Sequence, residues 1–167
     1  MSTLYLGARK GTVAPSVIFS GDPWRVEVLK RYLDDPVHVA FAREFNTYTG
    51  TYHGVPMTVS STGIGAPSAA IAVEEMYEAG MRVAVRMGTS MSLRDDMLGQ
   101  FIVPIAVMRR DGTSDTYVER GYPAVADVDL VNAMNQVVSD HGRRCLNGVT
   151  CSIDGFYTQM HDSRLSR

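Results

Sequence analysis

Short apolar runs alternate with amphipathic segments along this chain of 167 residues, and glycine or proline separates most of them. The apolar runs that predict strands are 16–20, 82–87, 99–108 and 147–154. The segments that predict helices are 24–33, 65–80 and 126–142. Asp22 is expected to cap the first helix, and Pro104 predicts a bulge or an edge strand. Segment 46–62 predicts a hairpin that turns at His53 and Gly54. Strands that alternate with helices indicate an α/β sandwich around a largely parallel or mixed sheet.

Length and composition predict one globular domain over residues 1–167, because 45% of the residues are hydrophobic. The net charge of −2 gives no reason to expect a nucleic-acid partner or an acidic membrane surface. We see no signal peptide and no apolar run of roughly 20 residues, so we expect a cytoplasmic protein without a membrane partner. Cys145 and Cys151 are too few for a disulfide scaffold, which also favours a reducing compartment.

An arginine stands at the carboxyl end of the most strand-like segment, RVAVRMGTSM (82–91). If the strand is buried, the guanidinium of Arg86 needs an anion beside it, since a buried and unpaired charge is costly. The anion could be a ligand or a core carboxylate such as Glu74 or Asp127. Residue types alone leave both alternatives open.

The turn VSSTGIGAPSAA is close to a dinucleotide-binding fingerprint but does not complete it. Gly63 and Gly65 are present, whereas Ser68 stands where the third glycine belongs. The fingerprint also needs an acidic residue about 20 positions later, where this chain has Arg86. No GxxxxGK[ST] phosphate loop occurs either. The sequence therefore disfavours a nicotinamide cofactor and an ordinary nucleotide site.

Two other turns, SGDPWR and RMGTS, carry groups that suit a tetrahedral oxyanion. Gly21 lets the backbone approach a ligand, and Arg25 follows it by one helical turn. Arg86, the Thr89 hydroxyl and the N–H groups after Gly88 add further donors. The planar fork of arginine can pair with two oxygens at once, which a lysine cannot do.

Five stretches together resemble one enzyme family. They are GDPWRVE, REFNTYTGTYHGVPMTVSSTGIGAPSAAIAVEE, VRMGTS, DGTS and YPAVADVDLVNA. From about Leu6 to about Tyr157, the chain resembles the uridine phosphorylase branch of the nucleoside phosphorylases. The resemblance implies an α/β, three-layer sandwich with a central mixed sheet. It also implies phosphate as co-substrate, no required cofactor, and a homo-oligomer, at least a dimer and in the family often a hexamer.

The resemblance also implies roles for individual residues. The phosphate ligands are Gly21, Arg25, Arg86 and Thr89, joined by Arg43 from the neighbouring subunit, with Arg25 and Arg86 as the catalytic pair. The nucleoside contacts are Tyr5 from the neighbouring subunit, Thr89, Met91, Phe156 and Gln159. Some family members hold a potassium ion, whose ligands here would be Glu44, Ile64 and Ser68. Glu44 could instead pair with an arginine, and Phe156 could instead belong to the core.

The chain departs from the family pattern at three places. Tyr5 stands where the family has a histidine, and Met91 stands where it has a glycine. Gln159 is displaced from the family's Gln-Xaa-Arg motif, and Arg164 lies too far along the chain to replace its arginine. A later Glu-Met-Glu segment that binds ribose has no match. We therefore expect a domain that is truncated at its C-terminal end, either as a fragment or as a shortened relative.

The function that these patterns favour is phosphorolysis of a nucleoside, most simply uridine or a related pyrimidine nucleoside, in pyrimidine salvage. The alternatives are a purine nucleoside phosphorylase and a catalytically silent module that binds phosphate or supports assembly. A nucleoside hydrolase fits less well, because water needs no pair of arginines. On this interpretation Arg86 faces a ligand phosphate.

Overall fold

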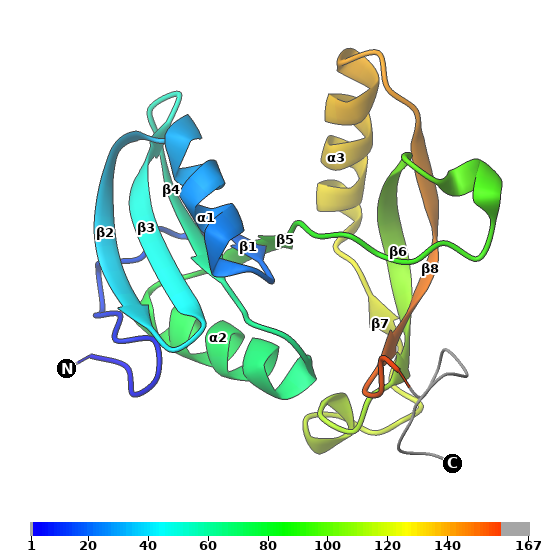
Figure 1. Cartoon of the computed structure of the whole chain (residues 1–167), viewed down its shortest axis with the longest axis horizontal. Helices are drawn as coiled ribbons and strands as arrows, with labels where there is room; N and C mark the ends of the chain where they lie inside the picture. Colours follow the sequence, from blue (N-terminus) through cyan, green and yellow to red (C-terminus); the bar gives the residue numbers. More distant parts are fainter. Residues whose placement is uncertain (1, 158–167) are drawn as a thin grey trace. The chain divides into compact units, whose positions relative to one another are not determined.

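The structure is a computed structural model that describes residues 2–157 (Figure 1). The chain divides into two compact units after Ser90, and each unit has its own mixed sheet. The predicted α/β class and the mixed pairing of strands are therefore confirmed, with the strands in two sheets rather than in one. The single domain over 1–167 stays a prediction. No helix within residues 2–157 has both the length and the apolar character needed to cross a bilayer.

The first unit contains a five-stranded sheet in the order β2-β3-β4-β1-β5 (Figure 1). Its strands are β1 (Ser16–Ser20), β2 (Asp34–Ala42), β3 (Phe45–Tyr52), β4 (Val55–Ser61) and β5 (Val83–Arg86). Strand β1 pairs in parallel with both β4 and β5, whereas β2, β3 and β4 form an antiparallel meander. The carboxyl ends of β1, β4 and β5 therefore lie at one edge of the sheet.

Helix α1 (Pro23–Leu29) packs on one face of this sheet, where Val26 and Val59 are buried together and Ile18 packs against them. The Asp22 side chain accepts a hydrogen bond of 2.8 Å from the backbone N–H of Trp24, which confirms the predicted cap. The α-helix is shorter than predicted, since a 3₁₀ turn, η1 (Lys30–Tyr32), completes the segment.

Helix α2 (Ala66–Ala79) belongs to the other face of the sheet. Phe19 lies next to Ile18 on β1 and so points to the opposite face, where it is buried with Met76 and Phe45. Gly80 ends the helix at a φ of +139°, and its N–H donates to the carbonyl of Met76. The first unit thus has helices on both faces of its sheet.

Strand β2 is absent from the sequence prediction, which left 34–42 without an element. The strand contains Pro36 and pairs with β3 through two register shifts, and Asp35 has a φ of +47°. Irregular pairing of this kind leaves no clear alternation for a sequence pattern to reveal. The neighbouring hairpin is confirmed, and both of its turn residues, His53 and Gly54, have positive φ.

The second unit has a three-stranded sheet in the order β7-β6-β8. Its elements are η2 (Asp95–Met97), β6 (Phe101–Arg110), η3 (Ser114–Thr116), β7 (Ala124–Val125), α3 (Val128–Asp140) and β8 (Cys145–Ile153). Strand β6 pairs in parallel with β8 and antiparallel with β7. The register shifts between Pro104 and Ala106, which confirms the predicted bulge. Asp127 caps α3 by accepting the N–H groups of Asp129 and Leu130.

The loop after β6 carries the DGTS stretch, and hydrogen bonds within the second unit hold it. The Asp111 carboxylate accepts the backbone N–H of Ser114 at 2.7 Å, and this bond lowers the pKa of Asp111. The side chain of Arg109 is 7% exposed and donates to the carbonyls of Ser114, Val118 and Glu119. The DGTS residues are therefore explained by the hydrogen bonds that hold their own loop.

A buried carboxylate fixes the segment that precedes β1. Glu75 on α2 is 9% exposed, and its two oxygens accept the backbone N–H groups of Tyr5 and Leu6 at 2.8–3.1 Å. Leu6 is fully buried in the core beneath this contact. The N-terminal segment is thus attached to α2 by an ion–dipole contact as well as by packing.

We expect Glu75→Gln to destabilise the first unit by about 1–3 kcal/mol, because the amide replaces one acceptor oxygen with a donor that faces N–H groups. Hydrogen exchange at the amides of Tyr5 and Leu6 should become faster at the same time. Glu74→Gln is the matched control, since Glu74 is the exposed neighbour on the same helix. Unchanged exchange at both amides in Glu75→Gln would contradict this account of the contact.

Candidate functional site

The parallel pairing of β1 with β5 brings two predicted turns together. Phe19 is paired with Arg86, and the N–H of Met87 donates to the carbonyl of Phe19 at 2.8 Å. Gly21 therefore lies beside the residues that follow β5. Two segments separated by more than 60 positions along the chain meet at one sheet edge, as the strand pattern predicts.

The guanidinium of Arg86 lies between two glycines. A Cβ placed on Gly21 would be 3.2 Å from Nη2, and one placed on Gly88 would be 3.1 Å from Nη1. Both distances are shorter than an ordinary van der Waals contact, so a side chain at either position would require the guanidinium to shift by a few tenths of an ångström. The glycines of SGDP and RMGT thus leave space for Arg86.

Arg86 is exposed, which corrects the expectation of a buried arginine. The physical reason is the position of β5, which pairs with β1 and is the last strand of its sheet. Among residues 2–157, no ion pair or hydrogen bond joins Arg86 to a carboxylate. The sequence offered two carboxylates as partners for Arg86. Of these, Glu74 is exposed on α2, and the Asp127 side chain caps α3.

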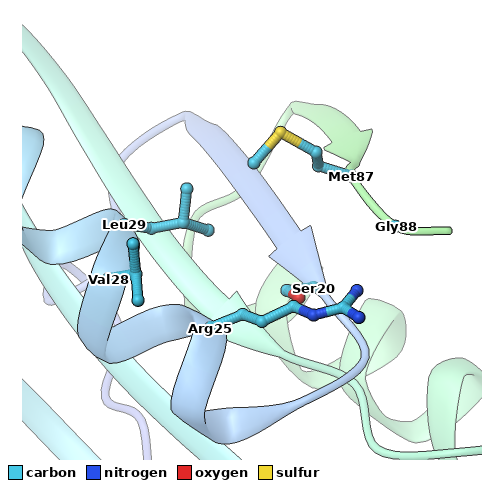
Figure 2. Close-up of a pocket in the computed structure, with 6 residues that line it drawn as sticks. All are labelled: Ser20, Arg25, Val28, Leu29, Met87 and Gly88. Atoms are coloured by element: carbon cyan, nitrogen blue, oxygen red, sulfur yellow. The ribbon is translucent and has the colours of Figure 1, made fainter. Parts of the chain in front are cut away.

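A pocket of about 290 Å³ lies in the first unit between α1 and the residues that follow β5 (Figure 2). Its lining residues are Ser20, Arg25, Val28, Leu29, Met87 and Gly88. Arg25 extends from α1 across this pocket, and its guanidinium has no carboxylate partner among the described residues (Figure 2). Gly88 is close to both arginines. It lines the pocket together with Arg25, and it lies next to Nη1 of Arg86.

The pocket is mostly apolar, with Val28, Leu29 and Met87 in its walls, and one guanidinium, that of Arg25, lines it. The Arg86 guanidinium lies next to Gly88 at its edge, so two groups with paired N–H donors are available to a small anion there. Thr89 follows Gly88 on the exposed end of the same turn. Of the residues predicted for an anion, the structure therefore brings Gly21, Arg25 and Arg86 together. The sequence prediction missed Ser20 and the apolar walls, although Ser20 directly precedes Gly21.

Two residues predicted to reach a neighbouring subunit lie close together. Arg43 belongs to the two-residue turn between β2 and β3, with a φ of +56°, and its Cζ is 5.6 Å from the centre of the Tyr5 ring. This distance is within the range of a cation–π contact. Both side chains are exposed, so the pair is available to a ligand or to another chain.

Glu44 and Ser68, two of the three residues predicted for an ion, are in contact. The Ser68 hydroxyl is 2.8 Å from Oε1 of Glu44 and 2.6 Å from the carbonyl of Thr62. The hydroxyl lowers the pKa of Glu44, and no ion pair within residues 2–157 joins Glu44 to Arg43. Gly63 has a φ of +68°, and a Cβ there would be 2.4 Å from Cγ of Glu44, so only glycine fits above this contact. The Ile64 side chain is 96% exposed.

The remaining predicted residues are not part of the first unit. Met91 and Phe156 belong to the second unit, where both side chains are 58% exposed. The exposure of Phe156 disfavours the alternative in which it is a core residue. Gln159 lies outside the described residues. Their contact with a nucleoside stays a prediction.

Sequence and structure comparisons give consistent results. The family described as the phosphorylase superfamily matches residues 15–165. The chain is 40% identical to uridine phosphorylase of Thermococcus kodakarensis, over 92% of this chain and 56% of the relative. It is 38% identical to uridine phosphorylase of Escherichia coli, over 92% and 62%, and 36% identical to guanosine phosphorylase of Halorubrum lacusprofundi, over 95% and 66%. The chain thus spans 56–66% of the length of these curated relatives.

Solved structures with the same fold include uridine phosphorylase from Vibrio fischeri, with a TM-score of 0.92 and 33% identity over 96% of this chain and 68% of that one. Purine nucleoside phosphorylase from Toxoplasma gondii, in complex with immucillin-H, has a TM-score of 0.88 and 31% identity, over 93% and 64%. The predicted fold family is therefore confirmed.

We expect Ser68→Ala to raise the pKa of Glu44 towards its ordinary value, because the hydroxyl that stabilises the carboxylate is lost. A lowered pKa adds stability above the unfolded pKa, and this stability is lost as the pH falls through the folded pKa. The acid-dependent part of the free energy of unfolding should therefore become smaller in Ser68→Ala. Carboxylate NMR titration measures the change, with Ser16→Ala at the far end of β1 as the control.

Proposed function

The chain belongs to the phosphorylase superfamily, and from this premise we propose that the protein is a nucleoside phosphorylase, a pentosyltransferase that cleaves a nucleoside with phosphate. The observation that carries the proposal is the pair of arginines beside Gly88, neither of which has a carboxylate partner among the described residues. Such a pair suits an anionic substrate. The products are the free base and ribose 1-phosphate.

The chemistry assigns a clear task to the arginines. As the C–N bond breaks, positive charge develops on the sugar and the electron pair leaves with the base. An oxygen of hydrogen phosphate then forms the new bond to C1′, and the proton that the phosphate gives up is taken by the departing base, which leaves as the neutral free base. Arg25 and Arg86 hold the phosphate in position next to the developing cation, with Gly21 and Thr89 as further ligands. Orientation and fixed charge therefore supply much of the rate enhancement.

The substrate in this proposal is uridine or a related pyrimidine nucleoside, as the names of several relatives suggest. A purine nucleoside is the second candidate, because a guanosine phosphorylase and a purine nucleoside phosphorylase are also among the similar proteins. Met91 and Phe156 would contact the base, and Gln159 belongs to the same prediction. A silent phosphate-binding module is the outcome if no nucleoside is cleaved.

The proposal includes an oligomer, at least a dimer, in which Arg43 and Tyr5 reach the site of a neighbouring subunit. The cation–π contact between them supports this idea, since it presents a cation and a hydroxyl together on an exposed surface. A phenol can donate to a ribose hydroxyl as the histidine of the family does. A cytoplasmic location is also part of the proposal, in agreement with the free thiols of Cys145 and Cys151.

A potassium ion would fit the residues near Gly63 in part. Alkali cations take oxygen ligands, and the Glu44 carboxylate and Ser68 hydroxyl already lie 2.8 Å apart. The carbonyl of Ile64 would complete the protein ligands, and the ion would neutralise the charge of Glu44. If this is correct, potassium should raise the melting temperature above its value in sodium, and Ser68→Ala should remove the difference.

We expect Arg86→Ala to lose phosphate binding, measured by calorimetry, and Arg86→Lys to retain weak binding, because an ammonium cannot form the two parallel hydrogen bonds. Arg82→Ala is the matched control. It removes the same charge just before β5, where the Arg82 guanidinium donates to the carbonyl of Met81 and lies over the Tyr77 ring. Unchanged phosphate affinity in Arg86→Ala would contradict the site.

The same preparations test the reaction. We assay release of base from uridine and guanosine with and without phosphate. The 167-residue chain alone should bind phosphate with little or no turnover, since its residues contain no match to the family's ribose-binding Glu-Met-Glu segment. Rapid turnover would show that other residues hold the sugar. If a longer form that carries the segment cleaves no nucleoside, the silent module becomes the better hypothesis.

A mixed dimer tests the shared site. Neither Arg43→Ala nor Arg86→Ala alone should form a complete phosphate site, whereas a heterodimer of the two chains should contain one complete site. We expect calorimetry of the mixture to recover up to half of the wild-type binding capacity. Dimerisation without any recovery of phosphate binding would show that Arg43 does not act across the interface.

A further inference from the structure

The last residue of β1 has a side chain that the fold leaves without a hydrogen bond. Ser20 is 1% exposed, and its hydroxyl has no partner within residues 2–157. Its carbonyl, in contrast, accepts from the N–H of Thr62 at 2.8 Å. A buried hydroxyl without a partner costs free energy, so such a group is uncommon in a folded protein.

The neighbouring serines on β4 do not share this property. Ser61 is paired with Ser20 across the sheet, and its hydroxyl donates to the carbonyl of Glu44 at 2.6 Å. The hydroxyl of Ser60 is 2.8 Å from that of Thr47. All three serines are buried, and Ser20 differs from the other two in lining the pocket.

Ser20 and Arg25 are the two residues with polar side chains among the six that line the pocket. Figure 2 shows Ser20 on the strand at the pocket wall and the Arg25 side chain extending towards it from α1. The other side chains, Val28, Leu29 and Met87, offer no hydrogen bond to an anion beyond the weak acceptor of the thioether. The Ser20 Oγ atom is itself buried, so a ligand oxygen that enters the pocket can satisfy it after a shift of the lining side chains.

We infer that Ser20 is a further ligand of the anion, and that its hydroxyl donates to an oxygen of phosphate held by Arg25 and Arg86. The inference rests on the proposed function, because it takes phosphate as the anion that enters the pocket. It adds a neutral donor to a set of charged ones. It also gives a role to a hydroxyl that is buried directly after the apolar run 17–19.

The test is phosphate titration of Ser20→Ala by calorimetry, with the free energy of unfolding measured without phosphate. We expect the phosphate Kd to rise about tenfold, as for a hydrogen bond to a charged group. Stability without phosphate should stay equal or increase, because an unpaired hydroxyl is removed. Ser20→Cys keeps the shape with a weaker donor and should give an intermediate Kd; it also serves if Ser20→Ala fails to fold.

Ser60→Ala is the matched control, since it removes a buried hydroxyl that has a partner outside the pocket. It should lower stability and leave the phosphate Kd unchanged. Wild-type affinity in both Ser20 variants would overturn the inference while the proposed function stands. If the wild-type protein binds no phosphate at all, the phosphate site fails first and the role of Ser20 fails with it.

Discussion

The parallel contact between β1 and β5 is the interaction on which the candidate site depends. These strands are separated in sequence by α1, the β2-β3-β4 meander and α2. Strand β1 pairs through five residues with β4 on one side and through four residues with β5 on the other. Without that register, Gly21 would not face Arg86. The core on both sheet faces, around Val26 and around Met76, keeps β1 in its central place.

At this edge of the sheet, glycines lie next to charged or polar side chains that occupy the space a Cβ atom would need. Gly21 and Gly88 leave the space that the Arg86 guanidinium occupies, and Gly63 leaves the space for Glu44 and Ser68. The same device therefore appears at two neighbouring turns. In both, the backbone approaches a polar side chain so closely that a methyl group would displace it. Gly63, one of the two glycines of the stretch that resembles a dinucleotide fingerprint, thus has a local steric explanation.

Local signals predicted most of the fold. Strand β1, the hairpin at His53, helix α2 with its Gly80 cap and the bulge at Pro104 each follow from residues that lie within the element. Strand β2 was missed because its pairing with β3 is irregular and is set by tertiary contact. The burial of Arg86 was predicted wrongly, since a sequence does not say which strand stands at the end of a sheet. Ser20 was overlooked because a serine in an apolar run resembles an ordinary strand residue.

The two glycines beside Arg86 also affect the entropy of the site. An exposed arginine usually samples many rotamers, and holding it against a ligand costs up to about 2 kcal/mol of side-chain entropy. Here Gly21 and Gly88 lack the Cβ atoms that would lie 3.1–3.2 Å from the two Nη atoms of Arg86, so the guanidinium keeps positions that other residues would exclude. The entropy is therefore lost when an anion binds rather than when the sheet forms. The glycine turns thus leave Arg86 an adaptable group, whose freedom is reduced by binding rather than by folding.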